Sequence, residues 1–446
     1  MKAAYYEQAG QMSVVDLDKP EIQKADDAII RVVRSCVCGS DLWAYSAGDS
    51  KQKHSINDGH EAIGIVEEVG EDVTTVKPGD FVIVPFTHGC GHCPACLAGF
   101  DGVCVDHDDN FSIGAQSQYL RFQHADWALV KVPGSLDDYS EGMLKSLLTL
   151  ADVMATGYHA AKIARVKPGD KVVVVGDGAV GQCAVIAAKM LGASQIIIMS
   201  RHEDRQKMAL ESGATDVVAE RGTEGIEKVL KLTGGYGADA VLECVGAQGS
   251  TDQAFGVVRP GGFIGRVGLP HGERMDPAET FYRNVTLAGG PASVTTYDKE
   301  VLLKAVLDGQ INPGKVFTNS YTLDEIDQAY KDMADRKTIK SYLIMDQDRR
   351  GCVGRPRFLE GVGSSGHEPY LTPAGLRISS VRQVKIPVLV GRHEIFTNFG
   401  GGDTKSPPVL VGEARKSPPV LVGNARNFHQ PWRSPPKKQA SRLQTP

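Results

Sequence analysis

The chain has 446 residues, of which 41% are hydrophobic and 23% charged, and its formal net charge at pH 7 is -5. This composition is ordinary for a globular protein of about three domain-sized units. The sequence has no apolar run of about 18 residues and no charged-then-apolar start, which argues against a membrane helix and a secretion signal. Nine cysteines, an odd number, fit thiolate metal ligands in a reducing compartment better than a disulfide framework, so we expect a soluble cytoplasmic protein.

The first 150 residues contain short strand-like segments that are broken by Gly and Pro. Residues 29–33, 62–69 and 81–85 are examples, and a Pro-Gly-Asp turn precedes the last of them. This pattern predicts a compact, mostly β domain.

Two residues of this part are candidate ligands of a catalytic metal. Cys38, in Cys-Gly-Ser-Asp, offers a thiolate, and His60, in Gly-His-Glu, offers an imidazole. A catalytic zinc takes three protein ligands and keeps one position open. The best third candidate is Asp152, because its neighbours in 151–157 are mostly apolar or small and an unpaired carboxylate would be costly to bury there. Taken singly, Cys38 could be a core residue, His60 a satisfied polar residue and Asp152 a helix cap.

Four cysteines within fifteen residues form a second metal motif. Their spacing is Cys-x2-Cys-x2-Cys-x7-Cys, and thiolates spaced in this way can close a tetrahedral shell around one zinc ion. A shell without an open position is structural, so the sequence predicts a metal-folded loop, with buried or disulfide-paired cysteines as the alternative. The predicted ligands are Cys90, Cys93, Cys96 and Cys104.

A strand–helix–strand pattern begins at residue 171. Residues 171–175 and 195–199 are apolar runs, and the Ala-rich stretch 179–191 between them has a helical pattern. Alternating buried strands and helices predict a parallel sheet. Its further strands are expected at 216–218, 240–244, 262–267 and 285–288, and residues 298–345 add two helical patterns and a final strand at 341–345.

The turn between the first of these strands and the helix carries a dinucleotide signature. The sequence Gly-Asp-Gly-Ala-Val-Gly lets the backbone turn tightly and approach a pyrophosphate, which then lies at the positive end of the helix. Its place between a strand and a helix makes the motif far more specific than an isolated glycine pattern. The residues expected at the cofactor are Gly176, Gly178, Ala179, Val180 and Gly181.

The end of the second strand predicts which cofactor is used. An NAD-binding fold usually places Asp or Glu there, to accept hydrogen bonds from the ribose hydroxyls. This chain has Ser200 instead, followed by Arg201 and Arg205. A 2′-phosphate is then not repelled, and a guanidinium can pair with it through two hydrogen bonds. We therefore expect NADP(H) to be preferred over NAD(H), the alternative being that Arg201 is a solvated surface residue.

Residues 348–446 differ in composition from the rest of the chain. They carry 16 Lys and Arg against 6 Asp and Glu, hold 12 of the 23 prolines, and repeat Lys-Ser-Pro-Pro-Val-Leu-Val-Gly at 405–412 and 416–423. Pro-rich polar sequence cannot bury enough apolar surface to offset chain entropy, so we expect a disordered tail. A basic arm that binds nucleic acid is the less favoured alternative.

Residues 1–347 resemble the zinc-dependent medium-chain dehydrogenase/reductase family of the alcohol dehydrogenase type. Both zinc motifs, the glycine turn and a signature around His60 carry the resemblance. That signature reads Gly59-His60-Glu61-x2-Gly64-x5-Gly70-x2-Val73. The resemblance implies an α/β protein with a β-rich, GroES-like catalytic domain at 1–153, completed by 291–347, and an inserted Rossmann-type domain with a doubly wound parallel sheet at 154–290.

The resemblance also implies roles for single residues. The three candidate ligands would bind the catalytic zinc, as in bacterial NADP-dependent secondary-alcohol dehydrogenases. Glu61 would be a carboxylate able to approach the metal during ligand exchange, Ser40 would pass on the proton of the substrate hydroxyl, and Thr156 would lie against the nicotinamide. A homodimer or homotetramer is expected.

The chain departs from the family pattern at Trp43. Relatives often have a histidine three residues after the proton-passing Ser or Thr, so the route beyond Ser40 is open, and His54 is a weak substitute. Trp43 is expected instead to line the substrate pocket, and Cys36 to pack in the core.

These expectations converge on a zinc-dependent alcohol dehydrogenase or carbonyl reductase that transfers hydride between NADP(H) and a small alcohol, ketone or aldehyde. A polyol or amino-alcohol dehydrogenase on the same scaffold is the enzymatic alternative. A non-catalytic, zinc-structured binding protein belongs to another class, and the intact ligand set argues against it, as it does against a metal-free quinone reductase. No membrane partner is expected, and nucleic acid is disfavoured.

Overall fold

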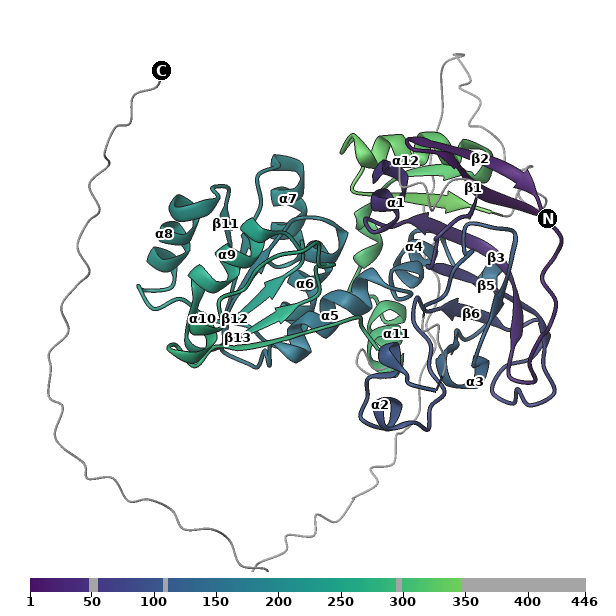
Figure 1. Ribbon diagram of the computed structural model, residues 1–446, viewed down its shortest axis with the longest axis horizontal. Helices are drawn as coiled ribbons and strands as arrows, with labels where there is room; N and C mark the ends of the chain where they lie inside the picture. Colours follow the sequence, from purple (N-terminus) through teal and green to yellow (C-terminus); the bar gives the residue numbers. More distant parts are fainter. Residues whose placement is uncertain (48–54, 107–110, 294–298, 346–446) are drawn as a thin grey trace, which may run out of the picture. The chain divides into compact units, whose positions relative to one another are not determined.

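The computed structural model describes residues 1–47, 55–106, 111–293 and 299–345 (Figure 1). The tail expected at 348–446 and the substitute candidate His54 lie outside these residues. Across the described ranges, no helix combines the length and the apolar character that a membrane crossing requires.

The β-rich part is built on a seven-stranded sheet, with a three-stranded sheet beside it. The strand order of the large sheet is β15-β16-β3-β5-β6-β8, and β7 also pairs with β3. Its strands are β3 (Ala28–Val37), β5 (Ala62–Val69), β6 (Phe81–Val84), β7 (Tyr119–Phe122), β8 (Val130–Lys131), β15 (Phe317–Thr322) and β16 (Lys340–Ile344). The small sheet has the order β2-β1-β4, formed by β1 (Lys2–Gln8), β2 (Gln11–Asp16) and β4 (Ser55–Ile56).

The C-terminal strand of the described chain lies beside an early strand in the large sheet. The last strand, β16, pairs antiparallel with β3, so that Ser341 lies opposite Val37 and Ile344 opposite Arg34. Figure 1 shows the green C-terminal elements beside the purple N-terminal ones. The helices of this part are α1 (Asp41–Ala47), α2 (Pro94–Leu97), α3 (Ala125–Ala128), α4 (Glu141–Thr149), α11 (Lys299–Leu307) and α12 (Ile326–Ala334), with short 3-10 turns at Asp101–Val103, Leu136–Asp138, Pro313–Val316 and Leu323–Glu325.

The middle of the chain forms the expected parallel sheet. Six strands lie in the order β11-β10-β9-β12-β13-β14, and every pair of neighbours is parallel. They are β9 (Lys171–Val175), β10 (Gln195–Met199), β11 (Asp216–Val218), β12 (Ala238–Glu243), β13 (Val258–Arg266) and β14 (Thr286–Gly289). The accompanying helices are α5 (Val153–Ile163), α6 (Ala179–Met190), α7 (Glu203–Ser212), α8 (Gly222–Leu232), α9 (Gln248–Val257) and α10 (Pro277–Phe281).

This sheet is buried on both faces. Val172, Val174 and Ile198 pack in one hydrophobic core, while Val173 and Ile197 pack in a second core on the other side. From β9 the chain winds outward in both directions, and ligands of such sheets bind at the carboxyl ends of the strands where the winding reverses. The α/β fold class, with a GroES-like part and a doubly wound sheet, is therefore confirmed.

Candidate active site and metal centres

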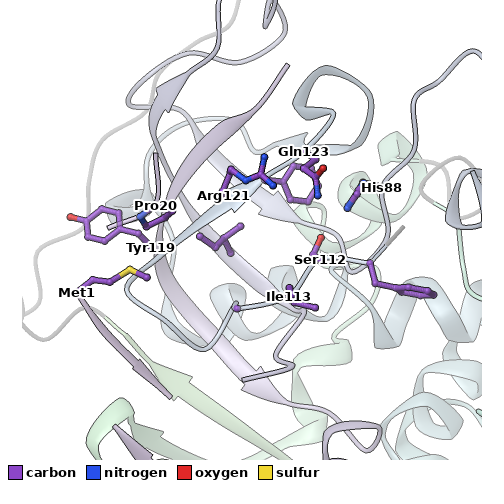
Figure 2. A pocket seen from close by; sticks show the side chains of 12 residues that line it. Met1, Pro20, His88, Ser112, Ile113, Tyr119, Arg121 and Gln123 are labelled. Carbon is purple, nitrogen blue, oxygen red and sulfur yellow. The ribbon is translucent and has the colours of Figure 1, made fainter. Parts of the chain in front are cut away.

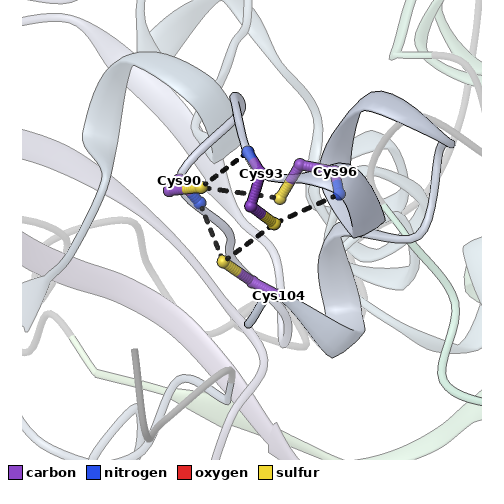
Figure 3. Close-up of side chains that lie close together, drawn as sticks. All are labelled: Cys90, Cys93, Cys96 and Cys104. Atoms are coloured by element: carbon purple, nitrogen blue, oxygen red, sulfur yellow. Dashed lines mark hydrogen bonds between the residues drawn. The ribbon is translucent and has the colours of Figure 1, made fainter. Parts of the chain in front are cut away.

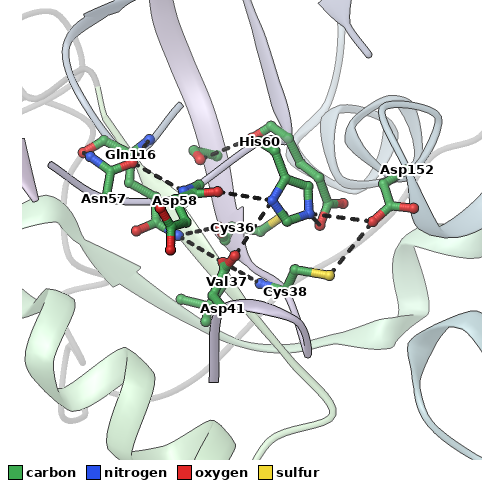
Figure 4. A network of polar contacts seen from close by, with 12 residues as sticks. Cys36, Val37, Cys38, Asp41, Asn57, Asp58, His60, Gln116 and Asp152 are labelled. Carbon is green, nitrogen blue, oxygen red and sulfur yellow. Dashed lines mark hydrogen bonds and ion pairs between the residues drawn. The ribbon is translucent and has the colours of Figure 1, made fainter. Parts of the chain in front are cut away.

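The three predicted ligands of the catalytic metal come together from distant parts of the chain. Cys38 follows β3, His60 precedes β5, and Asp152 precedes α5. Together with Glu61, each offers one ligand atom, and these atoms all lie within 4.8 Å of one another (Figure 4). Asp152 Oδ2 is 3.5 Å from Cys38 Sγ and 3.6 Å from His60 Nε2. One sulfur, one imidazole nitrogen and carboxylate oxygen form a donor set that suits zinc.

A buried aspartate positions two of these ligands. The Oδ1 of Asp41 lies 3.4 Å from Nδ1 of His60, and its Oδ2 accepts a 2.9 Å hydrogen bond from the backbone N–H of Cys38. His60 Nδ1 also lies 2.9 Å from the carbonyl oxygen of Asp58. These contacts turn Nε2 toward Asp152, as outer partners of metal-binding histidines do. Asp41 closes the Cys-Gly-Ser-Asp motif, but the motif alone does not indicate this positioning role.

Asp152 is held by the hydroxyl group of Thr156. Thr156 Oγ1 donates a 2.5 Å hydrogen bond to Asp152 Oδ1, one turn into α5. Asp152 is 6% exposed and makes no side-chain capping bond at the start of that helix, so helix capping does not account for it. Thr156, expected against the nicotinamide, thus also orients the third ligand candidate.

Lys340 on β16 forms a buried ion pair beside the cluster. Its Nζ lies 2.6 Å from Oε1 of Glu61, and both side chains are 1% exposed. Burial alone would lower the pKa of Lys340, but neighbouring Cys36 and Glu61 outweigh it and hold the pKa well above the usual value. No motif in the sequence indicates this lysine. It lies 279 positions after Glu61, and only the pairing of strands in the large sheet brings the two side chains together.

The electrostatics of the cluster fit a divalent cation. Burial would lower the pKa of His60, yet Asp41 and Asp152 raise it well above its ordinary value. Oε2 of Glu61 is buried and has no hydrogen-bond partner among the described residues. Orphaned buried acceptors are rare, and a cation would satisfy this one while replacing the proton on His60.

The four remaining predicted zinc ligands also converge (Figure 3). Sγ of Cys90 lies 4.0 Å from Sγ of Cys96, and Sγ of Cys93 lies 3.8 Å from Sγ of Cys104. Backbone N–H groups of Val105 and Cys96 lower the pKa of Cys93 to about 6, whereas burial raises the pKa of Cys90 to about 11 and also raises that of Cys96. A bound cation would favour the thiolate form of all four. None of the eight cysteines in the described ranges forms a disulfide, so the disulfide alternative does not hold there.

The glycine turn has the shape that a pyrophosphate requires. Gly176 has a φ of 112°, and a Cβ on Gly181 would lie 2.1 Å from the carbonyl oxygen of Gly176. Gly178, by contrast, has no atom within 4 Å of the Cβ position, immediately before α6 begins at Ala179. A phosphate can therefore approach the backbone and the first N–H groups of the helix.

The residues expected at the adenosine 2′-phosphate differ from one another in their charged neighbours and in their exposure. Asp177 accepts a 2.8 Å hydrogen bond from Ser200 Oγ and lies 3.2 Å from Nη1 of Arg205. Arg201 is exposed. Burial and the like charge of Arg201 lower the pKa of Arg221, which stands at the start of α8 and which sequence analysis missed.

The remaining candidates lie around α1. The carbonyl oxygen of Ser40 accepts a 3.1 Å hydrogen bond from the backbone N–H of Trp43, whose side chain is 54% exposed. Cys36 is 1% exposed and does not belong to the metal cluster. A separate cavity of about 230 Å³ near Met1, His88, Ile113 and Arg121 includes none of the predicted site residues (Figure 2).

Comparison with known proteins agrees with this architecture. Residues 24–134 match the family model "Alcohol dehydrogenase GroES-like domain", and residues 179–303 match "Zinc-binding dehydrogenase". The chain is 32% identical to an uncharacterized zinc-type alcohol dehydrogenase-like protein of Bacillus subtilis, over 76% of this chain and 97% of that protein. It is 31% identical to an NADP-dependent isopropanol dehydrogenase of Clostridium beijerinckii, over 72% and 93%.

Solved structures give the same result. The zinc-dependent alcohol dehydrogenase 2 from Streptococcus pneumonia, in its apo form, superposes with a TM-score of 0.69 and 32% identity, covering 78% of this chain and 99% of that structure. The fold and the glycine turn define a two-part dehydrogenase with a nicotinamide-cofactor sheet. The chain belongs to the zinc-dependent medium-chain alcohol dehydrogenases, and it is an oxidoreductase of that family.

Proposed function

We propose that the protein is a zinc-dependent alcohol dehydrogenase that transfers hydride between NADP(H) and a small alcohol or its ketone or aldehyde. The observation that carries this proposal is the partly buried cluster of Cys38, His60, Glu61 and Asp152 in the same chain as the dinucleotide turn. The first, second and fourth of these residues would hold the catalytic zinc, and the four clustered cysteines would hold a structural zinc.

A zinc ion bound there supplies Lewis acidity, which lowers the pKa of an alcohol and polarises a carbonyl group. The protein's own residues position the reactants. Asp41 and Thr156 orient His60 and Asp152, and the Lys340–Glu61 pair keeps a carboxylate within reach of the ligands. The Ser40 hydroxyl group would take the proton from the substrate hydroxyl.

The cofactor preference is part of the proposal. Ser200 replaces the carboxylate that would repel a 2′-phosphate, and Arg201 is exposed at the end of β10, with Arg221 as a neighbouring cation. The relative from Clostridium beijerinckii, which is described as NADP-dependent, supports the same choice. Carbonyl reduction with NADPH would be the favoured direction.

The domain boundaries, the cellular location and the oligomeric state are also proposals, and they rest on the resemblance to the family. The catalytic domain would comprise residues 1–153 and 291–347, and the cofactor domain residues 154–290. We propose a cytoplasmic homodimer or homotetramer, with small molecules as the only substrates.

Initial rates with NADPH and NADH test the function directly. The panel would contain small ketones, aldehydes, polyols and amino alcohols, each assayed before and after treatment with a chelator. Chelator-sensitive turnover of simple ketones with NADPH is expected. Turnover confined to polyols or amino alcohols would favour the enzymatic alternative, and an absence of turnover would favour the non-catalytic one.

The variant Asp152→Ala tests the third ligand. Because the remaining ligands cannot hold the metal in place, kcat/KM should fall by about 1,000-fold or more. The zinc content should drop from two to one per chain, since the four cysteines are untouched. Thr149→Ala, a buried change in the preceding helix, is the matched control. Full activity of Asp152→Ala would place the third ligand elsewhere.

A further inference from the structure

A stacked pair of rings joins the metal-binding part of the chain to the cofactor sheet. The indole ring of Trp43, on α1, lies with its centroid 3.5 Å from that of the His271 imidazole ring, at an interplanar angle of 27°. His271 belongs to the loop between β13 and α10. The two residues are 228 positions apart in the sequence, and no motif predicts their contact.

The loop that carries His271 is fixed at its base. A Cβ on Gly268 would lie 2.1 Å from the backbone nitrogen of Gly246, so the loops that follow β12 and β13 are in close backbone contact. Glu273 accepts a 3.1 Å hydrogen bond from the backbone N–H of His271 and lies 3.0 Å from Nη2 of Arg266, at the end of β13. His271 is therefore anchored to the carboxyl edge of the parallel sheet.

The far end of the loop is fixed as well. The backbone N–H of Arg274 donates a 2.9 Å hydrogen bond to Gln248, and the Gln248 amide donates one of 3.1 Å to the carbonyl oxygen of Arg274. The backbone of the segment that carries His271 is therefore held at both ends, while the residue itself is exposed.

Trp43 belongs to the metal-binding part of the chain. It lies in the first turn of α1, two residues after Asp41, which contacts both Cys38 and His60. Its backbone N–H donates to the carbonyl oxygen of Ser40. The stack therefore connects the helix next to the metal ligands with the loop at the cofactor edge.

We propose that Trp43 and His271 together form one wall of the substrate site and limit the size of the alcohol or ketone that can enter. This inference rests on the proposed function, in which substrate lies between the metal ligands and the carboxyl edge of the cofactor sheet. Because the stacked rings bridge the same two parts, a bulky substituent on the substrate carbon would have to displace them. The wall favours small aliphatic substrates over aryl ketones.

The test is the ratio of kcat/KM for acetophenone to that for acetone, measured with NADPH. Trp43→Ala should raise this ratio by about 10-fold or more, the size expected when a hydrophobic wall is removed. His271→Ala should raise it by about 2- to 10-fold, the contribution of one ring pair. The double variant should give the same ratio as Trp43→Ala, because Trp43→Ala alone already removes the stack.

His271→Phe is the matched control, since a flat ring can still stack, and its ratio should stay near the wild-type value. Ratios that are unchanged in Trp43→Ala, or effects that add in the double variant, would overturn the inference. A change as large in His271→Phe as in His271→Ala would also overturn it.

Tryptophan fluorescence separates this inference from the proposed function, because it needs no turnover. Removal of the imidazole in His271→Ala exposes the covered face of Trp43, so the emission should shift to the red. The shift should vanish in a Trp43→Phe background. An absence of the shift would refute the stack itself. A red shift in His271→Ala, together with a wild-type chain that reduces no carbonyl compound, would instead refute the proposed function, and with it the role of the wall.

Discussion

Two arginines that follow the second strand of the cofactor sheet have distinct electrostatic surroundings. Arg205 lies 3.2 Å from the carboxylate of Asp177, and its side chain is 12% exposed, so most of its charge is already compensated. Arg201 is exposed, and its charged neighbour is a second cation, Arg221. A 2′-phosphate would therefore gain more from Arg201 than from Arg205.

Replacing Arg201 should weaken the binding of NADPH selectively. A hydrogen bond to a charged group contributes about 1.5–3 kcal/mol, so Arg201→Ala should raise the Kd of NADPH by about 10- to 100-fold and leave the Kd of NADH nearly unchanged. Combining it with Ser200→Asp should reverse the preference, because a carboxylate accepts from ribose hydroxyls and repels phosphate.

Titration calorimetry with both cofactors measures these constants. Arg259→Ala is the control, because Arg259 pairs with Asp239 at the opposite, amino-terminal end of the strands. If the ratio of the two constants stayed at its wild-type value in Arg201→Ala, Arg201 would have no place at the phosphate.

At the scale of elements, α5 has a candidate metal ligand, Asp152, just before its first residue and a buried histidine in its middle. His159 is 1% exposed, and its Nδ1 has no hydrogen-bond partner among the described residues. Burial lowers the pKa of His159 to about 4. The folded protein thus holds this imidazole neutral over a pH range in which the unfolded chain would protonate it.

This difference predicts a loss of stability in mild acid. The unfolded state binds a proton below about pH 6.5 whereas the folded state does so only near pH 4, so the free energy of unfolding falls as the pH decreases between these values. At pH 5.5 the loss from His159 should be about 1 kcal/mol relative to pH 7.5.

Urea unfolding of the wild type and of His159→Leu at both pH values measures this contribution. Other groups titrate equally in the two proteins, so the wild type should lose about 1 kcal/mol more than the variant. Parallel losses in the two proteins would mean that His159 is not buried as a neutral ring.

Sequence patterns predicted the elements of the cofactor sheet well, and for a physical reason. Strands β9 and β10 are unbroken apolar runs between turn signals, so their ends are those expected from the sequence. The expected strand 262–267 instead begins at Val258 and ends at Arg266. Pro260 and the two glycines after it disfavour a strand locally, but pairing with β12 across a register shift extends β13 through them.

The candidate site was predictable only in part. Cys38 and His60 lie in local motifs, and Asp152 stood out as a carboxylate among small and apolar residues. Lys340 and His271 carry no such signal, because their partners Glu61 and Trp43 are reached only through the tertiary fold.

At the scale of the whole molecule, the chain returns to its beginning in order to complete the site. The described strands of the large sheet end with β16 at Ile344, which pairs with β3 just before Cys38. Tyr342 and Leu343 of β16 are fully buried, and Lys340 reaches Glu61 from the same strand. In the sequence, the six-stranded parallel sheet therefore lies between the two segments that build the large sheet.

This arrangement predicts opposite outcomes for two truncations. A chain that ends at Asp348 keeps β16 and should melt at the wild-type temperature with full zinc content. A chain that ends at Thr338 loses the strand. Each large buried side chain that is removed costs about 2–5 kcal/mol, and the total stability of a domain is about 5–15 kcal/mol.

The shorter chain should therefore lose cooperative unfolding and zinc binding at Cys38, His60 and Asp152. Circular dichroism melting and zinc analysis on both truncated chains and on the full chain measure this. The variant Lys340→Met in the full chain separates the two contributions of β16, because it keeps the strand and removes only the charge opposite Glu61. Similar melting of the two truncated chains would show that β16 does not hold the catalytic unit together, whatever its contact with Glu61.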